Sequence, residues 1–424
     1  MRFATKALHA GHNPDKSNHS ITVPIYSNTA FSFEDLNHAA DLFDLKTSGD
    51  IYTRISNPTN NILEERLAEL EGGVGALVVS SGQSASLLSV LNIVSAGDEI
   101  VASSSLYGGT TNLFAVTLKK LGIKTTFVAS ENPEDYAKHI TDKTKCIYTE
   151  FIGNPKLNIA DVEGLAKVAH RYDIPLIVDS TVATPYLSRP FEFGADIVIH
   201  STSKYIGGHG NSLGGVIIDS GKFDWSKSAK FKELVEPDPS YHGMSYVESF
   251  KEAAYITKAR VQLIRDLGTT LSPFNAFLIL QGIETLNLRM ERHSQNAYDV
   301  AKFLENHSAV EWVNYPKMKN SPYYDLAQKY FPKGASSLVT FGIKGGQEAG
   351  AKFIDSINLL IHATNIGDSR SIITYPALTT HRQLNLEQLN ACGISSGFMR
   401  LSIGLEDVQD IIEDINQALN KSQG

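Results

Sequence analysis

The chain has 424 residues, and its 38 lysines and arginines against 46 aspartates and glutamates give a net charge of −8. A chain of this length is too long for one simple hydrophobic core, so we expect two or three domains. The acidic balance argues against a nucleic-acid-binding surface. No apolar run approaches the roughly 18 residues of a membrane span, and the amino terminus lacks the apolar core of a secretory signal.

Cysteine and histidine usage argues against two further classes of protein. The two cysteines, Cys146 and Cys392, lie far apart and lack the spacing of a metal site. The 13 histidines contain no H-E-x-x-H pairing. We therefore expect neither a disulfide framework nor metal-dependent catalysis, and a cytoplasmic enzyme is the class that remains.

Three regions follow one another along the chain. Residues 1–56 show little periodicity and are rich in Asn, Ser, Thr and His, which predicts an extended N-terminal arm. Residues 57–260 begin with a helical pattern that stops at Gly72-Gly73, a typical helix end. Short apolar strands then alternate with helical stretches, which predicts an α/β domain with a mostly parallel sheet flanked by helices. The predicted strands are 76–80, 99–103, 124–128, 145–150, 175–179, 196–200 and 213–219.

The alternation weakens after Gly221. A loop or insertion with a turn at 238–243 leads into a helical region over 247–290, which is interrupted near Pro273. Strands at 337–343 and 398–404 then mix with helices, and an amphipathic helix closes the chain at 407–419. Residues 261–424 are therefore predicted to form a smaller α+β C-terminal domain.

Lys204 is the most informative residue, in the run S-T-S-K-Y-I-G-G-H-G that follows an apolar strand. The apolar strand before it ends in Asp179. A pyridoxal 5'-phosphate (PLP) enzyme requires this pair, because the lysine amine forms a Schiff base with the cofactor and the carboxylate keeps the pyridine nitrogen protonated. Neighbouring strands of an open α/β sheet bring both side chains to one crevice. A lone lysine here is ordinarily a surface residue, and the pairing favours the catalytic interpretation.

A cofactor phosphate needs hydrogen-bond donors. Ser81, Gly82 and Gln83 lie where a predicted strand gives way to a helix, so backbone N–H groups and the positive end of the helix dipole converge there. Ser201 and Ser203 add hydroxyl groups beside the lysine. Strand-to-helix turns often contain Ser and Gly, so the assignment of these residues to phosphate binding depends on the other candidate site residues.

Four further positions complete the candidate site. Arg54, in the arm, offers a permanently charged bidentate contact to a phosphate, although taken alone it is better interpreted as a surface residue without a role. Tyr107 follows a strand and can stack on a pyridine ring; a packing role is the alternative. Asn154 can bind a ring oxygen or a substrate carboxylate, or simply form an Asn-Pro turn. Arg400, in an apolar strand, needs a partner, either a substrate α-carboxylate or an internal acid.

Together these segments closely resemble the trans-sulfuration, or Cys/Met metabolism, family of fold-type I PLP enzymes over nearly the whole chain. The motifs that carry the resemblance are P-I-Y-S-N-T-A-F, Y-T-R-I-S-N-P-T, S-S-G-Q-S-A, S-L-Y-G-G-T, V-D-S-T-V-A-T-P-Y, H-S-T-S-K-Y-I-G-G-H and R-L-S-I-G-L-E-D, in this order.

The resemblance implies a role for each candidate residue. It makes Lys204 the Schiff-base lysine and proton carrier, with Asp179 on the pyridine nitrogen and Tyr107 on the ring. The implied phosphate ligands are Ser81, Gly82, Gln83, Ser201 and Ser203, and the implied substrate-binding residues are Asn154, Asn365 and Arg400. It also implies that Tyr52 and Arg54 reach the phosphate of the neighbouring subunit, with Tyr52 and Tyr107 also catalytic. The enzyme is then a dimer with shared sites, assembled into a homotetramer.

Within the family, three segments resemble the O-acetylhomoserine sulfhydrylases: E-P-D-P-S-Y-H-G at 236–243, N-I-G-D at 365–368 and Y-P-A-L-T-T-H at 375–381. Gly109 stands where methionine γ-lyases usually have Cys, and Leu378 stands where sulfhydrylases more often have Ser. The implied reaction converts O-acetyl-L-homoserine and sulfide, or methanethiol, into L-homocysteine, or L-methionine, and acetate. The alternatives are a methionine γ-lyase, a cystathionine-forming or cystathionine-cleaving relative, and a PLP-binding regulator without turnover.

Overall fold

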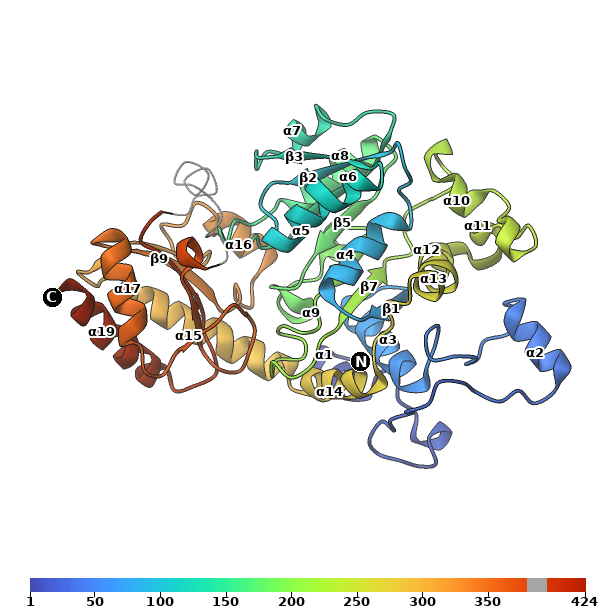
Figure 1. The fold of residues 1–424 in the computed structure, drawn as a ribbon, viewed down its shortest axis with the longest axis horizontal. Coiled ribbons are helices and arrows are strands. Elements are labelled where there is room, and N and C mark those ends of the chain that lie inside the picture. The colour runs from blue at the N-terminus through green and yellow to red at the C-terminus, as the bar shows by residue number, and fades with distance from the viewer. Residues whose placement is uncertain (380–394) are drawn as a thin grey trace.

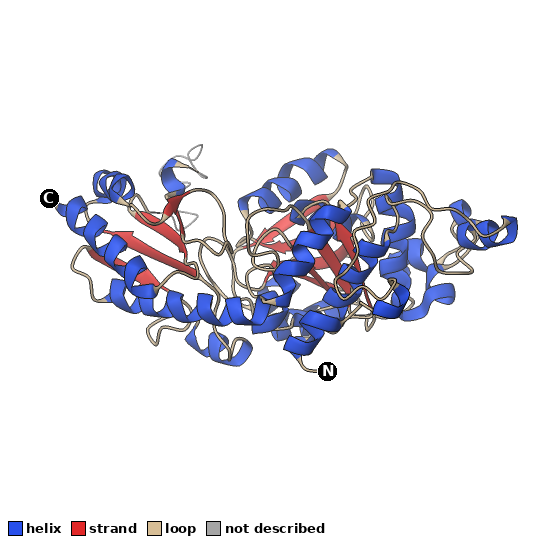
Figure 2. Ribbon diagram, turned by 90° about the horizontal axis from the view of Figure 1, so that it is seen from below, coloured by secondary structure: helices blue, strands red, loops and turns tan. Residues whose placement is uncertain are grey.

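The computed structural model describes residues 1–379 and 395–424, and two β-sheets organise it. A seven-stranded sheet forms the centre of the larger part, and a five-stranded sheet forms the smaller C-terminal part (Figure 1). Viewed from below, the two sheets lie side by side with helices around both (Figure 2). The predicted α/β fold with a smaller α+β C-terminal domain is confirmed.

The large sheet has the strand order β1-β7-β6-β5-β4-β2-β3. Five neighbouring strands, β3, β2, β4, β5 and β6, pair in parallel. Strand β7 pairs antiparallel with both β6 and β1. The strands other than the edge strand β3 are largely buried, as expected for a sheet covered on both faces. Their bounds are β1 Gly75–Val79, β2 Glu99–Ser103, β3 Lys124–Val128, β4 Thr144–Glu150, β5 Leu176–Asp179, β6 Ile197–His200 and β7 Gly215–Asp219.

Helix boundaries follow from local capping chemistry. The Asn57 side chain accepts the Thr59 N–H at the start of α3, Pro58 occupies the first turn, and Gly72 ends the helix in the left-handed region at φ 89°. The predicted helix stop at Gly72 is confirmed. The helices of this part are α3 Pro58–Glu71, α4 Gly82–Leu91, α5 Gly108–Asn112, α6 Leu118–Lys120, α7 Pro133–Ala137, α8 Val162–Arg171 and α9 Thr184–Leu187.

The N-terminal arm is less uniform than predicted. Residues 3–9 form helix α1, and its Ala7 is fully buried in the main core. That segment therefore docks on the α/β domain, whereas the sequence predicted an extended arm over the whole of residues 1–56. The rest of the arm extends away from the body with helix α2 (Leu36–Phe43) at its far end (Figure 1). Leu36 and Phe43 are both exposed there.

The region after β7 is helical, and its first part contains the insertion at 236–243. Asp238 anchors that insertion by accepting the Ser240 N–H and the Tyr246 hydroxyl. Pro273 begins a new helix, which explains the predicted interruption. The helices are α10 Lys232–Val235, α11 Tyr246–Phe250, α12 Ala254–Lys258, the π-helix Ala259–Ile264, α13 Arg265–Leu267, α14 Pro273–Glu284 and α15 Leu286–Glu305.

The C-terminal sheet has the order β10-β11-β12-β9-β8 and its own apolar core. The long helix α15 leads into it from the larger part (Figure 1). Its elements are β8 Val310–Asn314, α16 Tyr324–Tyr330, β9 Leu338–Ile343, α17 Gly346–Ser356, β10 Ile361–His362, β11 Ile372–Thr374, β12 Phe398–Ser402 and α19 Val408–Gln423. Domain limits at 1–56, 57–260 and 261–424 stay a prediction.

Within residues 1–379 and 395–424, no helix combines the length and apolarity needed to cross a membrane. The same residues contain no group of three or more His, Cys, Asp or Glu side chains arranged to hold a metal ion. Cys146 is a free thiol buried in β4, and Cys392 lies outside the described residues.

Candidate active site

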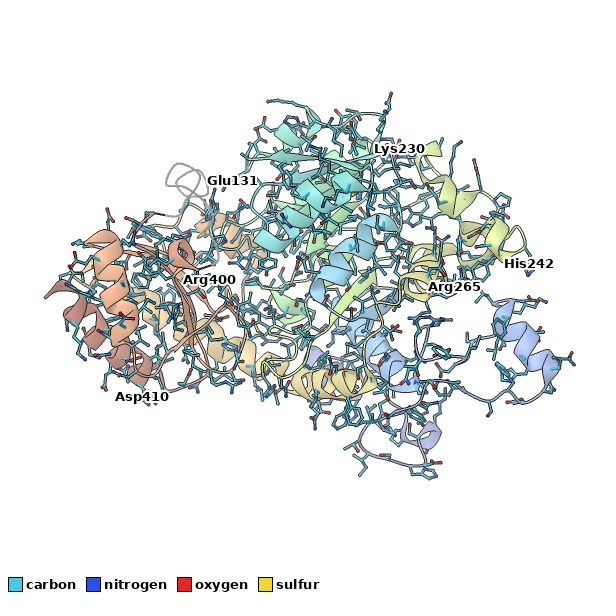
Figure 3. The ribbon with its side chains drawn as sticks, in the orientation of Figure 1. Glu131, Lys230, His242, Arg265, Arg400 and Asp410 are labelled. Carbon is cyan, nitrogen blue, oxygen red and sulfur yellow. The ribbon has the colours of Figure 1, made fainter. Side chains whose placement is uncertain are left out.

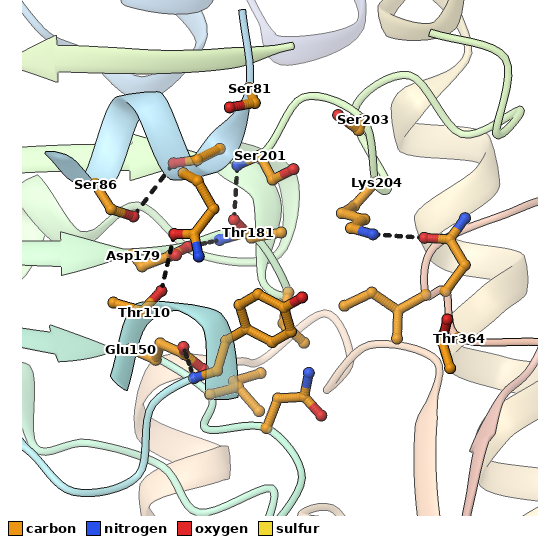
Figure 4. A pocket seen from close by; sticks show the side chains of 18 of the residues that line it. Ser81, Ser86, Thr110, Glu150, Asp179, Thr181, Ser201, Ser203, Lys204 and Thr364 are labelled. Carbon is orange, nitrogen blue, oxygen red and sulfur yellow. Dashed lines mark hydrogen bonds between the residues drawn. The ribbon is translucent and has the colours of Figure 1, made fainter. Parts of the chain in front are cut away.

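A pocket of about 280 Å³ opens at the carboxyl ends of β4, β5 and β6, on the side that faces the C-terminal domain (Figure 4). Parallel strands end on the same edge, so residues that follow them converge there. Eleven of the predicted site residues line this pocket: Ser81, Gly82, Gln83, Tyr107, Asn154, Asp179, Ser201, Ser203, Lys204, Asn365 and Arg400. The structure thus brings together segments that are up to about three hundred residues apart in sequence.

Lys204 lies just beyond β6, and its amine points across the pocket. Its Nζ donates a hydrogen bond to Asn365 Oδ1 at 2.5 Å (Figure 4). Burial and then the charge of Arg400 lower the pKa of the Lys204 amine. The side chain is therefore both positioned and more easily deprotonated than a surface lysine.

Asp179 ends β5, the strand that pairs in parallel with β6. The predicted neighbourhood of Asp179 and the lysine strand is confirmed. Its carboxylate accepts the Thr181 N–H at 2.9 Å, and Thr181 Oγ1 accepts the Ser201 N–H at 2.8 Å. Burial raises the pKa of Asp179. A cation bound beside this carboxylate would lower its pKa and favour its ionised form.

Ser81, Ser201 and Ser203 lie together at one end of the pocket (Figure 4). Ser81 caps α4 by accepting the Ser84 N–H at 3.1 Å, and the first turn of α4 has backbone N–H groups without helical acceptors. At Gly82 an added Cβ would lie 2.6 Å from the Ser201 Cβ, so only a glycine allows this close approach. Free donors at a helix start and nearby hydroxyl groups form an anion cradle.

Tyr107 is the residue before α5; it lines the pocket and is 52% exposed. Its backbone N–H donates to the Glu150 carboxylate. Gly109 packs tightly beneath it, because an added Cβ would lie 2.4 Å from Gln83 Nε2 and 2.6 Å from Tyr107 Cε1. The absence of a side chain at Gly109 therefore sets where the Tyr107 ring lies.

Arg400 reaches the pocket from β12 of the C-terminal sheet (Figure 3). Nη1 donates to Asn154 Oδ1 at 2.9 Å, and Nη2 donates to Thr374 Oγ1 at 3.1 Å and to the Asn365 carbonyl at 3.4 Å. Nε is buried without a partner, and burial lowers the pKa of Arg400 to about 10. All these partners are neutral, so among the described residues no carboxylate offsets this buried charge.

Tyr52 and Arg54 do not line the pocket of their own chain. Both are exposed on the arm, and the Arg54 guanidinium lies over the Tyr52 ring, 5.0 Å from its centroid. Thr270 holds this segment by donating its hydroxyl to the Arg54 carbonyl at 2.8 Å. The prediction that both residues serve a neighbouring subunit stays a prediction. Of the motif at 375–381, residues 380 and 381 lie outside the described part of the chain.

Sequence reasoning missed several pocket residues. Glu150 ends β4 just as Asp179 ends β5, so the rule that selected one acid at a strand end applies equally to the other. Thr181 connects Asp179 to Ser201, a link that no sequence pattern signals. The other unpredicted lining residues are Ser86, Thr110, Ile152, Val182, Leu213, Thr364 and Ile366.

The pocket fits PLP on the chemistry of its own residues. The anion cradle at the start of α4 suits a phosphate, and the recessed Asp179 suits a protonated pyridine nitrogen. The amine of Lys204, with its lowered pKa, suits covalent attachment to an aldehyde. Fold and pocket together define the class of protein, a PLP-dependent enzyme of fold type I.

Comparison with known proteins identifies the family. The chain belongs to the Cys/Met metabolism PLP-dependent enzyme family, whose model matches residues 4–420. It is 51% identical to an O-acetyl-L-homoserine sulfhydrylase of Leptospira meyeri, over 98% of this chain and 96% of the relative. It is 47% identical to a homocysteine synthase of Schizosaccharomyces pombe, over 98% of both chains.

A solved structure from Campylobacter jejuni, described as an O-acetylhomoserine (thiol)-lyase, superposes with a TM-score of 0.95 at 42% identity. The match covers 99% of this chain and 100% of the other. That structure carries N'-pyridoxyl-lysine-5'-monophosphate at its position 205. The expected resemblance, fold type and PLP cofactor are thus confirmed.

Proposed function

We propose that this enzyme catalyses a γ-replacement, in which O-acetyl-L-homoserine and sulfide give L-homocysteine and acetate, as a cytoplasmic step of methionine biosynthesis. Methanethiol in place of sulfide gives L-methionine directly. Sulfhydrylases and homocysteine synthases match the chain over nearly its full length, which supports this substrate. The structural observation that carries the proposal is one small pocket that holds the Lys204 amine, the Asp179 carboxylate and the Arg400 guanidinium.

The cofactor is held by residues from both ends of the pocket. Residues 81–83 with Ser201 and Ser203 would bind the phosphate, and Asp179 would pair with the pyridine nitrogen. Tyr107 would cover the ring. When bound, PLP supplies the electron sink that stabilises negative charge next to the substrate amine.

Substrate orientation and proton transfer fall to the remaining residues. Arg400 and Asn154 hold the α-carboxylate, because a guanidinium without an acidic partner gains most from a bidentate anion. Lys204 moves protons on the substrate, and its lowered pKa suits that task near neutral pH. Asn365 positions the lysine amine during the reaction.

A product assay tests this reaction. Purified enzyme with O-acetyl-L-homoserine and sulfide is expected to release homocysteine and acetate in equal amounts, with little 2-oxobutyrate. L-methionine and cystathionine serve as control substrates, from which little thiol or 2-oxoacid is expected. Dominant release of 2-oxobutyrate would make the protein a γ-lyase, and no turnover of any substrate would favour a PLP-binding regulator.

The arm completes the site of a neighbouring subunit in this proposal, within a homotetramer built from dimers. Tyr52 and Arg54 are exposed and lie outside their own pocket, while the phosphate cradle contains no permanent positive charge. An Arg54→Ala chain mixed with a Lys204→Ala chain is expected to regain activity, because one site of each hybrid has both residues intact. If hybrids form and stay as inactive as the parents, Arg54 does not act across subunits.

A further inference from the structure

Glu150 is a buried carboxylic acid in the pocket that has no part in the function proposed above. It ends β4, is 6% exposed and lines the pocket at the end away from the serine cluster (Figure 4). In the parallel pairing of β4 with β5, Glu150 stands directly opposite Asp179. Two acids on adjacent strands, roughly 5 Å apart along the sheet, therefore share one recess.

The contacts of Glu150 connect two segments of the site. Its carboxyl group accepts the backbone N–H of Tyr107, the residue that covers the cofactor ring. Asn154, the residue bound to Arg400, lies in the loop after β4, which begins at Glu150. No other side chain ties the loop after β2 to the loop after β4 in this way among the described residues of the pocket.

We propose that Glu150 is a positioning residue that joins the loop of Tyr107, after β2, to the loop of Asn154, after β4. Glu150 does so as a neutral acid, so the negative charge on this side of the pocket belongs to Asp179.

The surroundings of Glu150 explain why one of the two acids stays protonated. Burial and then the charge of Asp179 raise the pKa of Glu150 well above its usual range, and the smaller opposing effect of the Tyr107 N–H does not offset them. Tyr148, on the same strand, is a neutral phenol, and burial raises its pKa further above the ordinary value. Neither Lys204 nor Arg400 is among the groups that shift the pKa of Glu150. A protonated pyridine ring beside Asp179 would stabilise the negative charge of Asp179, but it would not stabilise a second negative charge on Glu150.

Three variants separate positioning from charge. Glu150→Gln keeps the size and the acceptor oxygen but cannot ionise, whereas Glu150→Ala removes the acceptor and leaves the Tyr107 N–H without its partner. Glu163→Gln is the matched control, because Lys167 and Lys329 lower the pKa of that surface acid to about 2 and keep it ionised.

The holoenzyme is measured by infrared difference spectroscopy and by titrating the cofactor absorbance with pH. Subtracting the Glu150→Gln spectrum from that of the parent at pH 7 should reveal one protonated-carboxyl band, which the Glu163→Gln difference lacks. The cofactor titration midpoint should be unchanged in Glu150→Gln. Glu150→Ala should weaken cofactor binding and raise KM by about tenfold each, as expected for unpaired buried donors, while Glu150→Gln restores both.

Two results would overturn the proposal. A missing carboxyl band, or a titration midpoint moved by a pH unit or more in Glu150→Gln, would mean that Glu150 is ionised. If Glu150→Ala left both cofactor binding and KM unchanged, Glu150 would not position either loop. Because the spectra and the cofactor titration need no turnover, failure here is distinct from failure of the proposed γ-replacement.

Discussion

The two walls of the pocket are built in opposite ways. The wall on the large sheet carries carboxyl groups, Asp179 and Glu150, whose pKa values are raised by burial. The wall contributed by the C-terminal domain carries Arg400, whose pKa is lowered by burial. Each wall holds a charge that the protein itself does not fully compensate. The difference indicates that the first wall is prepared for a cationic ring and the second for an anionic group of the substrate.

Removing the charge of the first wall should have the largest effect. Asp179→Asn keeps the size of the side chain but no longer favours a protonated pyridine nitrogen, so turnover should fall by about a thousandfold or more. Cofactor should still bind, more weakly, as followed by absorbance. Near-normal activity would show that another residue supports the electron sink. Asp219→Asn, at the opposite edge of the same sheet, is the control and should leave activity unchanged.

Asp219 can be compared with Asp179 and Glu150, because it is also a buried acid but lies outside the pocket. It is 1% exposed, its Oδ2 has no partner, and burial raises its pKa to about 7. Between the unfolded pKa near 4 and about 7, the unfolded chain binds fewer protons than the folded one, so rising pH lowers the free energy of unfolding. Over this pH range the free energy of unfolding should fall by up to about 4 kcal/mol. Asp219→Asn should remove it, seen as a flatter dependence of stability on pH from 4 to 8.

Weakening the second wall should affect substrate and not cofactor. Arg400→Lys keeps a positive charge but loses the bidentate fork, so kcat/KM should fall by about a hundredfold, chiefly through KM. The cofactor absorbance should not change. The exposed Arg292 of α15 is the matched control, since Arg292→Lys should have no effect on either quantity. A changed cofactor spectrum with an unchanged KM would assign Arg400 to the cofactor instead.

Adjacent glycines give the smallest and most local test of the first wall. An added methyl group at Gly109 would collide with Gln83 and Tyr107, whereas at Gly108 it would meet nothing within 4 Å. Gly109→Ala should displace the Tyr107 ring and lower kcat/KM by about tenfold, with little change in Tm. Gly108→Ala should behave like the parent. Equal kinetics in the two variants would mean that the ring position does not matter.

Much of the large domain was predictable because its signals are local. Short apolar runs mark most strands of the seven-stranded sheet, and the helix stop at Gly72 follows from glycine chemistry. The neighbourhood of Asp179 and Lys204 follows from the rule that parallel strands end at one edge. Helix α1 was missed because a seven-residue helix is stabilised by docking Ala7 into the core and not by its own pattern.

The sequence by itself determined the class of chemistry, because a strand-end lysine, a strand-end aspartate and a serine-glycine turn each carry their chemistry in their local context. Only the tertiary structure decided what surrounds them. Glu150 became a partner of Asp179 through strand register, and Arg400 became a pocket residue through the packing of a second sheet. Both depend on contacts between segments distant along the chain, and burial there changes the charge of side chains in ways that no local pattern records.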